Sequence, residues 1–172
     1  MRVAIIYSSH TGNTKCVASA IKDALKDQEI VYFGKIPKNL SDIHADLYFI
    51  GSWTDKGNSS SETIQLIQKM KKEKIAYFGT AGYGGNQHYY DQLFKRIQRE
   101  IDPSNQILGY FFCQGKMPIQ VRDRYIQLLT QNPEDANLKV SIHNFDEALS
   151  HPDEHDLDHA KDWANDIICS IK

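Results

Sequence analysis

The run Val3-Ala4-Ile5-Ile6 leads directly into Tyr7-Ser8-Ser9-His10-Thr11-Gly12-Asn13-Thr14, and a helical pattern begins near Lys15. The apolar, partly β-branched run predicts a buried strand, and the hydroxyl-rich stretch with one glycine predicts a short loop. A loop of this kind at the start of a helix places backbone N–H groups and hydroxyls around an anion. We therefore interpret residues 9–14 as a phosphate-binding loop.

The residue types of this loop suit a phosphate held by hydrogen bonds. The hydroxyls of Ser9, Thr11 and Thr14 can converge on it, while Gly12 and Asn13 tolerate the backbone angles of a tight turn. The loop has neither the Gly-x-Gly-x-x-Gly fingerprint of dinucleotide-binding proteins nor the Gly-x-x-x-x-Gly-Lys-[Ser/Thr] motif of nucleoside triphosphatases. The alternative is an ordinary strand-to-helix turn in which Ser or Thr caps the helix.

Residues Ser9-His10-Thr11-Gly12-Asn13-Thr14 resemble the [Thr/Ser]-x-Thr-Gly-Asn-Thr phosphate loop of the flavodoxin family, and they follow the first strand as in that family. The resemblance implies that the loop holds the 5′-phosphate of FMN. It extends more loosely over nearly the whole chain, so we expect residues 1–172 to form one flavodoxin-like domain.

Apolar runs predict strands at residues 2–8, 28–33, 46–51, 74–79 and 107–113. Because helical patterns separate these runs, they predict an α/β fold, a doubly wound five-stranded parallel sheet with helices on both faces. The resemblance implies the flavodoxin-like strand order 2-1-3-4-5. After the last strand we expect a helix over 118–130, a short helical turn at 144–149 and a final helix that starts at Ser150.

The loops after the first, third and fourth strands all fall on one edge of this sheet. In open α/β sheets, ligands bind beyond the carboxyl ends of the strands, beside the point where the strand order reverses. The loop after the third strand is turn-rich and contains one large aromatic residue, and the next loop is rich in glycine. The predicted cofactor-binding residues are Ser9, His10, Thr11, Gly12, Asn13, Thr14, Ser52, Trp53, Thr54, Lys56, Gly57, Thr80, Ala81, Gly82, Tyr83, Gly84 and Gly85.

Within this set the resemblance implies particular roles. Aromatic side chains flank the flat flavin ring and exclude water from it, so Trp53 is expected on one face and Tyr83 on the other face or edge. The alternatives are a surface or core role for Trp53, and Tyr89 or His88 in the place of Tyr83. The backbone amides of residues 80–85 would hold the pyrimidine edge of the ring.

Gly57 and Lys56 have more specific expected roles. In relatives, a glycine beside the ring turns its carbonyl toward flavin N5 on reduction, and Gly57 is the candidate here. It stands further from the aromatic residue than the glycine of relatives does. Lys56 would stabilise the reduced anionic flavin if it lies near N1; the alternative is an ordinary solvated lysine.

The composition limits the classes of protein to consider. The 172 residues suit one domain, and no segment is apolar for long enough to cross a membrane or to act as a signal peptide, so we expect a cytoplasmic protein. The cysteines Cys16, Cys113 and Cys169 form no Cys-x-x-Cys pair, which excludes an iron–sulfur or zinc ribbon. Residues 1–100 carry 14 Lys/Arg and 10 Asp/Glu (+4), and residues 101–172 carry 6 and 12 (−6).

Three further groups of residues have a pattern that could form a site. His151, His155 and His159 recur every four residues, but Asp and Glu residues surround them, so we interpret them as a solvated helix face and not as a metal site. The Gln114–Lys116 stretch ends the last strand on the functional edge; it could touch a partner or substrate, or be a simple turn. The lysine-rich run at 69–74 lacks interleaved aromatic residues, so no nucleic-acid partner is expected.

The resemblance implies an FMN-binding, monomeric electron carrier that shuttles electrons between redox partner proteins, a reductase and an acceptor. Such a carrier needs no catalytic acid, base or nucleophile, and the sequence shows none. The first alternative is an FMN-bearing reductase, or the small flavin subunit of a reductase, for example of tetrapyrrole pigments. The second is a non-redox module that binds a phosphate ligand or a protein.

Overall fold

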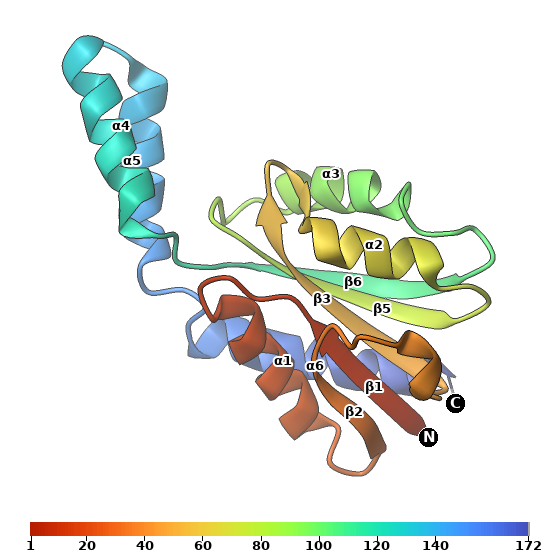
Figure 1. The fold of residues 1–172 in the computed structure, drawn as a ribbon. Helices are drawn as coiled ribbons and strands as arrows, with labels where there is room; N and C mark the ends of the chain where they lie inside the picture. Colours follow the sequence, from red (N-terminus) through yellow and green to blue (C-terminus); the bar gives the residue numbers. More distant parts are fainter. Residues whose placement is uncertain (172) are drawn as a thin grey trace.

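Five parallel strands form the centre of the protein in the order β2-β1-β3-β5-β6 (Figure 1). This computed structural model describes residues 1–171; Lys172, the last residue of the predicted domain, lies outside the described residues. The order is the one predicted, and a short strand β4 pairs antiparallel with the end of β3. The strands are β1 (Arg2–Tyr7), β2 (Glu29–Lys35), β3 (Leu47–Asp55), β4 (Asn58–Ser59), β5 (Lys74–Ala81) and β6 (Gln106–Gln114).

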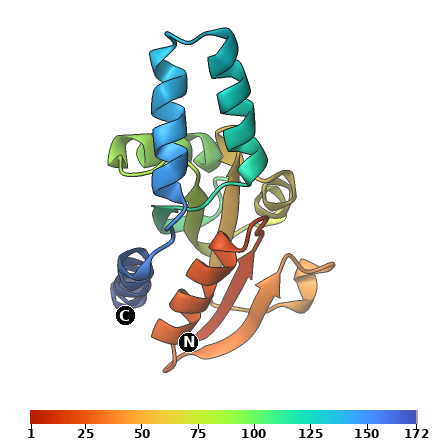
Figure 2. The same ribbon diagram turned by 90° about the vertical axis from the view of Figure 1, so that its left-hand side faces the viewer.

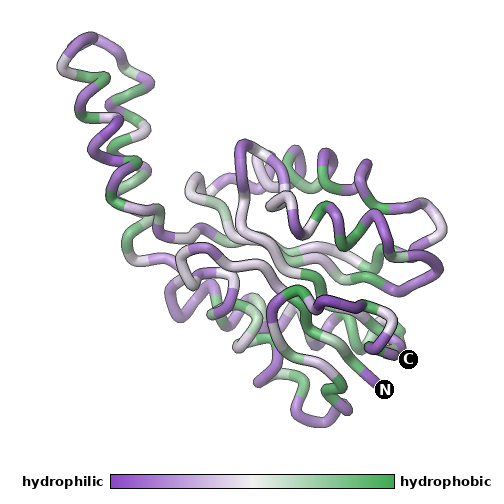
Figure 3. The backbone as a smooth tube through the Cα atoms, in the orientation of Figure 1, coloured by the Kyte–Doolittle hydropathy of each residue, from purple (hydrophilic) through white to green (hydrophobic). Residues whose placement is uncertain are grey.

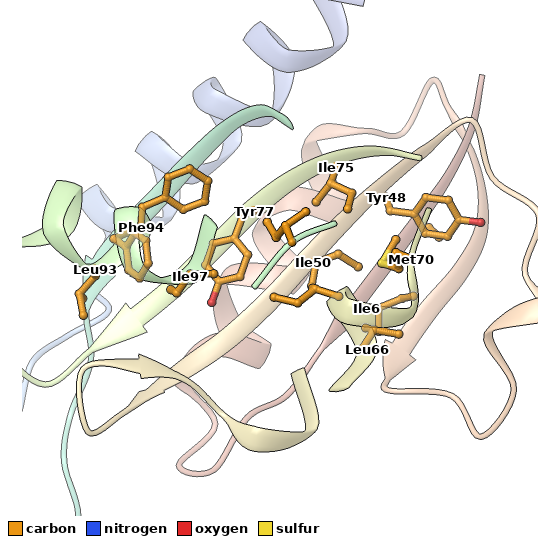
Figure 4. Close-up of a cluster of buried hydrophobic side chains, with 14 of the residues drawn as sticks. Ile6, Tyr48, Ile50, Leu66, Met70, Ile75, Tyr77, Leu93, Phe94 and Ile97 are labelled. Carbon is orange, nitrogen blue, oxygen red and sulfur yellow. The ribbon is translucent and has the colours of Figure 1, made fainter. Parts of the chain in front are cut away.

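Alternate residues of the central strands point to opposite faces of the sheet, and helices cover both faces. Ile6, Ile50 and Tyr77 face α2 (Ser61–Lys69) and α3 (Gln87–Gln98), and this cluster is drawn in Figure 4. Ile5 and Phe49 face α1 (Asn13–Ala24) and α6 (Glu154–Ile171) on the other side. Because both faces are covered, the strands are nearly continuous apolar runs, which is why the sequence reveals them.

The short helices and turns follow from local sequence. The 3₁₀ helix η1 (Leu40–Asp42) lies between β2 and β3. Ser60 caps α2, because its hydroxyl accepts a hydrogen bond from the Thr63 N–H. None of the helices among residues 1–171 has the length and apolarity that a bilayer-spanning helix requires.

A pair of antiparallel helices stands away from the rest of the molecule. α4 (Ile119–Gln131) and α5 (Ala136–Ala148) extend from the end of β6, and both views show them projecting beyond the sheet and its covering helices (Figures 1 and 2). α4 buries no residue, and α5 buries only Phe145 and Ala148. Hydrophobic residues nevertheless recur along both helices (Figure 3). We refer to residues 119–148 as the helical hairpin.

Beyond β6 the sequence-based prediction was incomplete. Instead of a short turn at 144–149, α5 runs for 13 residues from a cap at Asp135, whose carboxylate accepts hydrogen bonds from the Asn137 and Leu138 amides. The final helix begins later than Ser150. Asp153 and Asp156 each accept a hydrogen bond from the backbone N–H of the other, so the capping box begins at Asp153, three residues after the predicted start of the helix.

A substitution at Gly51 tests whether close packing between β3 and β5 stabilises the fold near the end of β3. A Cβ atom on Gly51 would lie 2.2 Å from the ring of Phe78 on the neighbouring strand. We expect Gly51→Ala to lower the free energy of unfolding by about 1–3 kcal/mol through overpacking, measured by urea denaturation. The control is Gly34→Ala on the edge strand β2, where the nearest atom is the Tyr32 hydroxyl at 3.2 Å. Equal denaturation midpoints for the two variants would contradict this account.

Candidate functional site

The carboxyl ends of β1, β3, β5 and β6 meet at one edge of the sheet, and a cleft of about 300 Å³ opens there. One part of its lining is polar and comes from the loop after β1 and the end of β5. The other part is mainly apolar and comes from β3, the loop after β5 and the chain after β6. The cleft is lined by His10, Thr11, Asn13, Trp53, Thr54, Thr80, Ala81, Gly82, Gly115, Lys116, Met117, Pro118 and Val121.

The loop after β1 presents the amino end of α1. Gly12 precedes the helix with a φ of 91°, in the left-handed region that favours glycine. Ser9 Oγ accepts a hydrogen bond from the Lys15 N–H at 3.3 Å. Among the described residues, the backbone N–H groups of Asn13 and Thr14 have no protein acceptor, as is usual in the first turn of a helix. These two amides can therefore donate to an anion.

Two hydrogen bonds fix this loop against the rest of the edge. The hydroxyls of Thr14 and Thr80 are 2.9 Å apart and buried, so the Thr14 hydroxyl faces β5 and not the opening of the loop. Asn13 Nδ2 donates to Thr11 Oγ1 at 2.8 Å and to the Lys116 carbonyl at 2.9 Å. The loop is thus tied to β5 and to the chain after β6.

The residues of the cleft fit the group that the loop motif implies. Asn13 is 6% exposed, and its Oδ1 is a buried acceptor without a hydrogen-bond partner among the described residues. A buried amide oxygen of this kind is costly unless a donor reaches it. The anionic end of a suitable ligand would accept hydrogen bonds from the free amides, and one of its hydroxyls would donate to this oxygen. A flat apolar part would pack against the apolar lining.

Trp53 lines the cleft, but it does not lie in a loop. β3 continues to Asp55 because β4 pairs with it, and Trp53 lies within the strand, opposite Thr80 of β5. Its ring packs against His10 of the loop after β1, with ring centroids 5.2 Å apart. An indole thus lies beside the polar part of the cleft.

Lys56 and Gly57 form the tip of the β3–β4 turn. Both have positive φ, 48° and 78°, which is the pattern of a two-residue type I′ hairpin turn. The Gly57 carbonyl accepts a hydrogen bond from Arg96 Nη1 at 3.2 Å. Neither residue lines the cleft. Ser52 is buried, and its hydroxyl accepts a hydrogen bond from the Ser60 N–H. It therefore stabilises the end of the strand and does not face the cleft.

The loop after β5 contributes fewer residues than expected. Ala81 and Gly82 line the cleft, whereas Tyr83 does not; it is 45% exposed and packs edge-on against Tyr89. Gly84 and Gly85 line a separate open groove of about 670 Å³ beside β6. Ser9 and Gly12 each line a neighbouring pocket, on other sides of the same phosphate loop.

Sequence reasoning missed most of the lining that follows β6. Gly115, Met117, Pro118 and Val121 lie on the cleft with Lys116, whereas the sequence places only the Gln114–Lys116 stretch at this edge, as a contact for a partner or substrate and not for the cofactor. The available signal was topological, since the end of β6 reaches the same edge as the other loops.

Cys113 and the three histidines lie around the separate groove. Cys113 is buried, and burial raises the pKa of its thiol well above the usual range, so it stays protonated and is a poor nucleophile. His155 and His159 are exposed, as predicted for a solvated face, with ring centroids 3.9 Å apart. His151 is half-buried instead, because its Nδ1 bonds to the capping residue Asp156.

The sequence matches the family described as flavodoxin domain over residues 4–165. A flavodoxin-like domain-containing protein, BilS, of Clostridium symbiosum is 37% identical, and the alignment spans 91% of this chain and 90% of that protein.

Two solved structures show a similar fold. The flavodoxin of Streptococcus pneumoniae TIGR4 superposes with a TM-score of 0.59 at 13% identity, covering 99% of each chain. A flavoprotein of Lactobacillus acidophilus NCFM, solved in complex with FMN, gives a TM-score of 0.51 at 21% identity, covering 65% of this chain and 93% of that one.

Proposed function

The chain belongs to the flavodoxin family, and we propose that it is an electron-transfer protein that binds FMN in the cleft and passes electrons between redox proteins. The observation that carries the proposal is the meeting of three loops, distant in sequence, at one cleft with a polar and an apolar part. When bound, the flavin supplies a ring system that accepts and releases electrons singly or in pairs.

The residues of the phosphate loop would hold the anionic end of the cofactor. The free amides of Asn13 and Thr14 point into the region where the helix dipole favours negative charge. Thr11 and His10 line the same part of the cleft. Trp53 would cover part of the ring and exclude water from it, which disfavours added negative charge on the ring.

The cleft contains little that could perform acid–base chemistry on a substrate. Of the described residues that line it, only His10 and Lys116 are titratable, and His10 packs against Trp53. No carboxylate or thiol of the described chain lines it. This composition favours a carrier over an enzyme with a substrate pocket of its own.

A second candidate is the small flavin subunit of a larger reductase. The observation that favours it is the helical hairpin, which follows Pro118, lines the cleft with Val121 and stands away from the sheet (Figure 2). A carrier that meets many partners does not need such an appendage, whereas a dedicated partner could bind it. Both candidates use the same cofactor and the same cleft.

One assay separates a carrier from a reductase. We expect the FMN-loaded protein, once photoreduced without oxygen, to reduce about two molecules of cytochrome c per flavin, because its flavin gives up electrons singly. Addition of NADH or NADPH to the oxidised, loaded protein should leave its visible spectrum unchanged. Rapid bleaching of the flavin by either nucleotide would contradict the carrier and support a reductase.

Trp53 provides a test of the site itself. We expect Trp53→Ala to weaken FMN binding about tenfold, roughly 1.4 kcal/mol, because the ring loses an aromatic contact, and to shift its reduction potentials. The measurements are quenching of FMN fluorescence and a spectroelectrochemical titration. Trp163→Phe, at the other tryptophan, which packs on Phe49 and Phe111, is the control. Unchanged affinity and potentials in Trp53→Ala would remove Trp53 from the site.

A further inference from the structure

The chain after β6 forms a side of the cleft that the loop motif does not assign. Gly115, Lys116, Met117, Pro118 and Val121 all line it, whereas the loop after β5 contributes nothing beyond Gly82. We refer to these five residues as the wall segment. It occupies the part of the site for which an aromatic residue, Tyr83, was expected.

Three hydrogen bonds from its backbone groups hold the wall segment, two to other backbone groups and one to a side chain. The Gly115 N–H donates to the Ala81 carbonyl at 2.9 Å, and the Lys116 N–H donates to the His151 carbonyl at 3.0 Å. The Lys116 carbonyl accepts from Asn13 Nδ2. The segment is therefore tied to the end of β5, to the turn between α5 and α6 and to the phosphate loop, so its position is fixed.

Met117 is the residue of the wall segment that lies against Gly82. A Cβ atom built on Gly82 would be 2.4 Å from Met117 Sδ, so the methionine fills the space that a side chain there would take. Met117 is half-buried and lines the cleft together with Val121. A thioether is polarisable and packs well against aromatic surfaces, and its flexible chain adapts to their shape.

We propose that Met117, supported by Val121, is the second ring-contacting side chain of the flavin cleft, alongside Trp53 and in place of Tyr83. This proposal rests on the proposed function, because it concerns the same cofactor. One side of the ring would then meet an aliphatic, thioether surface instead of a second aromatic ring. Such a surface excludes water without offering a π face, and so it disfavours the charged, reduced flavin.

The test compares FMN binding and reduction potential in variants of this segment. We expect Met117→Ala to weaken FMN binding about tenfold and to raise the potential of full reduction, because water then reaches the ring. Met117→Leu, which conserves volume, should stay within about threefold of the wild type, and Met117→Gln should behave like the alanine variant. The matched control is Ile119→Ala, two residues further on, which is 55% exposed and does not line the cleft.

The results distinguish a failure of this proposal from a failure of the proposed function. If Met117→Ala and Met117→Gln bind FMN as tightly as the wild type does, the proposal is wrong while the proposed function stands. The same holds if Tyr83→Ala weakens FMN binding and the Met117 variants do not. Tighter binding by Met117→Ala would also overturn it, since the side chain would then compete with the ring. A wild-type protein that takes up no FMN would overturn both. Thermal unfolding of each variant, followed by circular dichroism, verifies that the variants are folded.

Discussion

The buried hydrogen bond between Thr14 and Thr80 is the constraint on which the geometry of the site depends. It joins the first turn of α1 to the end of β5, two elements 66 positions apart in sequence. Because neither hydroxyl reaches water, loss of one would leave the other unpaired in the interior. The bond therefore fixes where the free amides of the phosphate loop point relative to the rest of the cleft.

Asn13 connects the phosphate loop to the chain that follows the edge strand β6. Through its bond to the Lys116 carbonyl, the phosphate loop, the end of β5 and the chain after β6 form one connected edge. The parallel strand order is what brings these carboxyl ends together. The strand order thus brings the loops of the site together, and a few buried polar contacts fix their positions relative to one another.

The sequence predicts much of this structure and misses the parts that depend on long-range contacts. The five parallel strands are apolar runs because both faces of the sheet are buried. Each can therefore be identified in the sequence by a run such as Val3–Ile6. The extension of β3 past Trp53 depends on pairing with β4, and the contact between Asn13 and Lys116 spans 103 positions. Neither leaves a local pattern.

The helical hairpin was half predicted for a related reason. Both helices contact mainly each other and not the sheet, so neither has a strong apolar face, and the pattern of α5 is the weaker of the two. A bidentate pair between Arg122 and Asp146 joins the two helices at an exposed position, where such a pair adds little stability. Since the hairpin buries so few residues, we expect it to open more readily than the sheet.

The central claim is that the loop at residues 9–14 holds a phosphate at the amino end of α1. The most direct measurement is the ratio of the dissociation constants for riboflavin and FMN, which share the ring and differ in the phosphate, obtained from fluorescence titrations at fixed ionic strength. We expect FMN to bind at least about a hundredfold more tightly, since charge-assisted hydrogen bonds to backbone amides are strong. Equal affinities for the two flavins would contradict it.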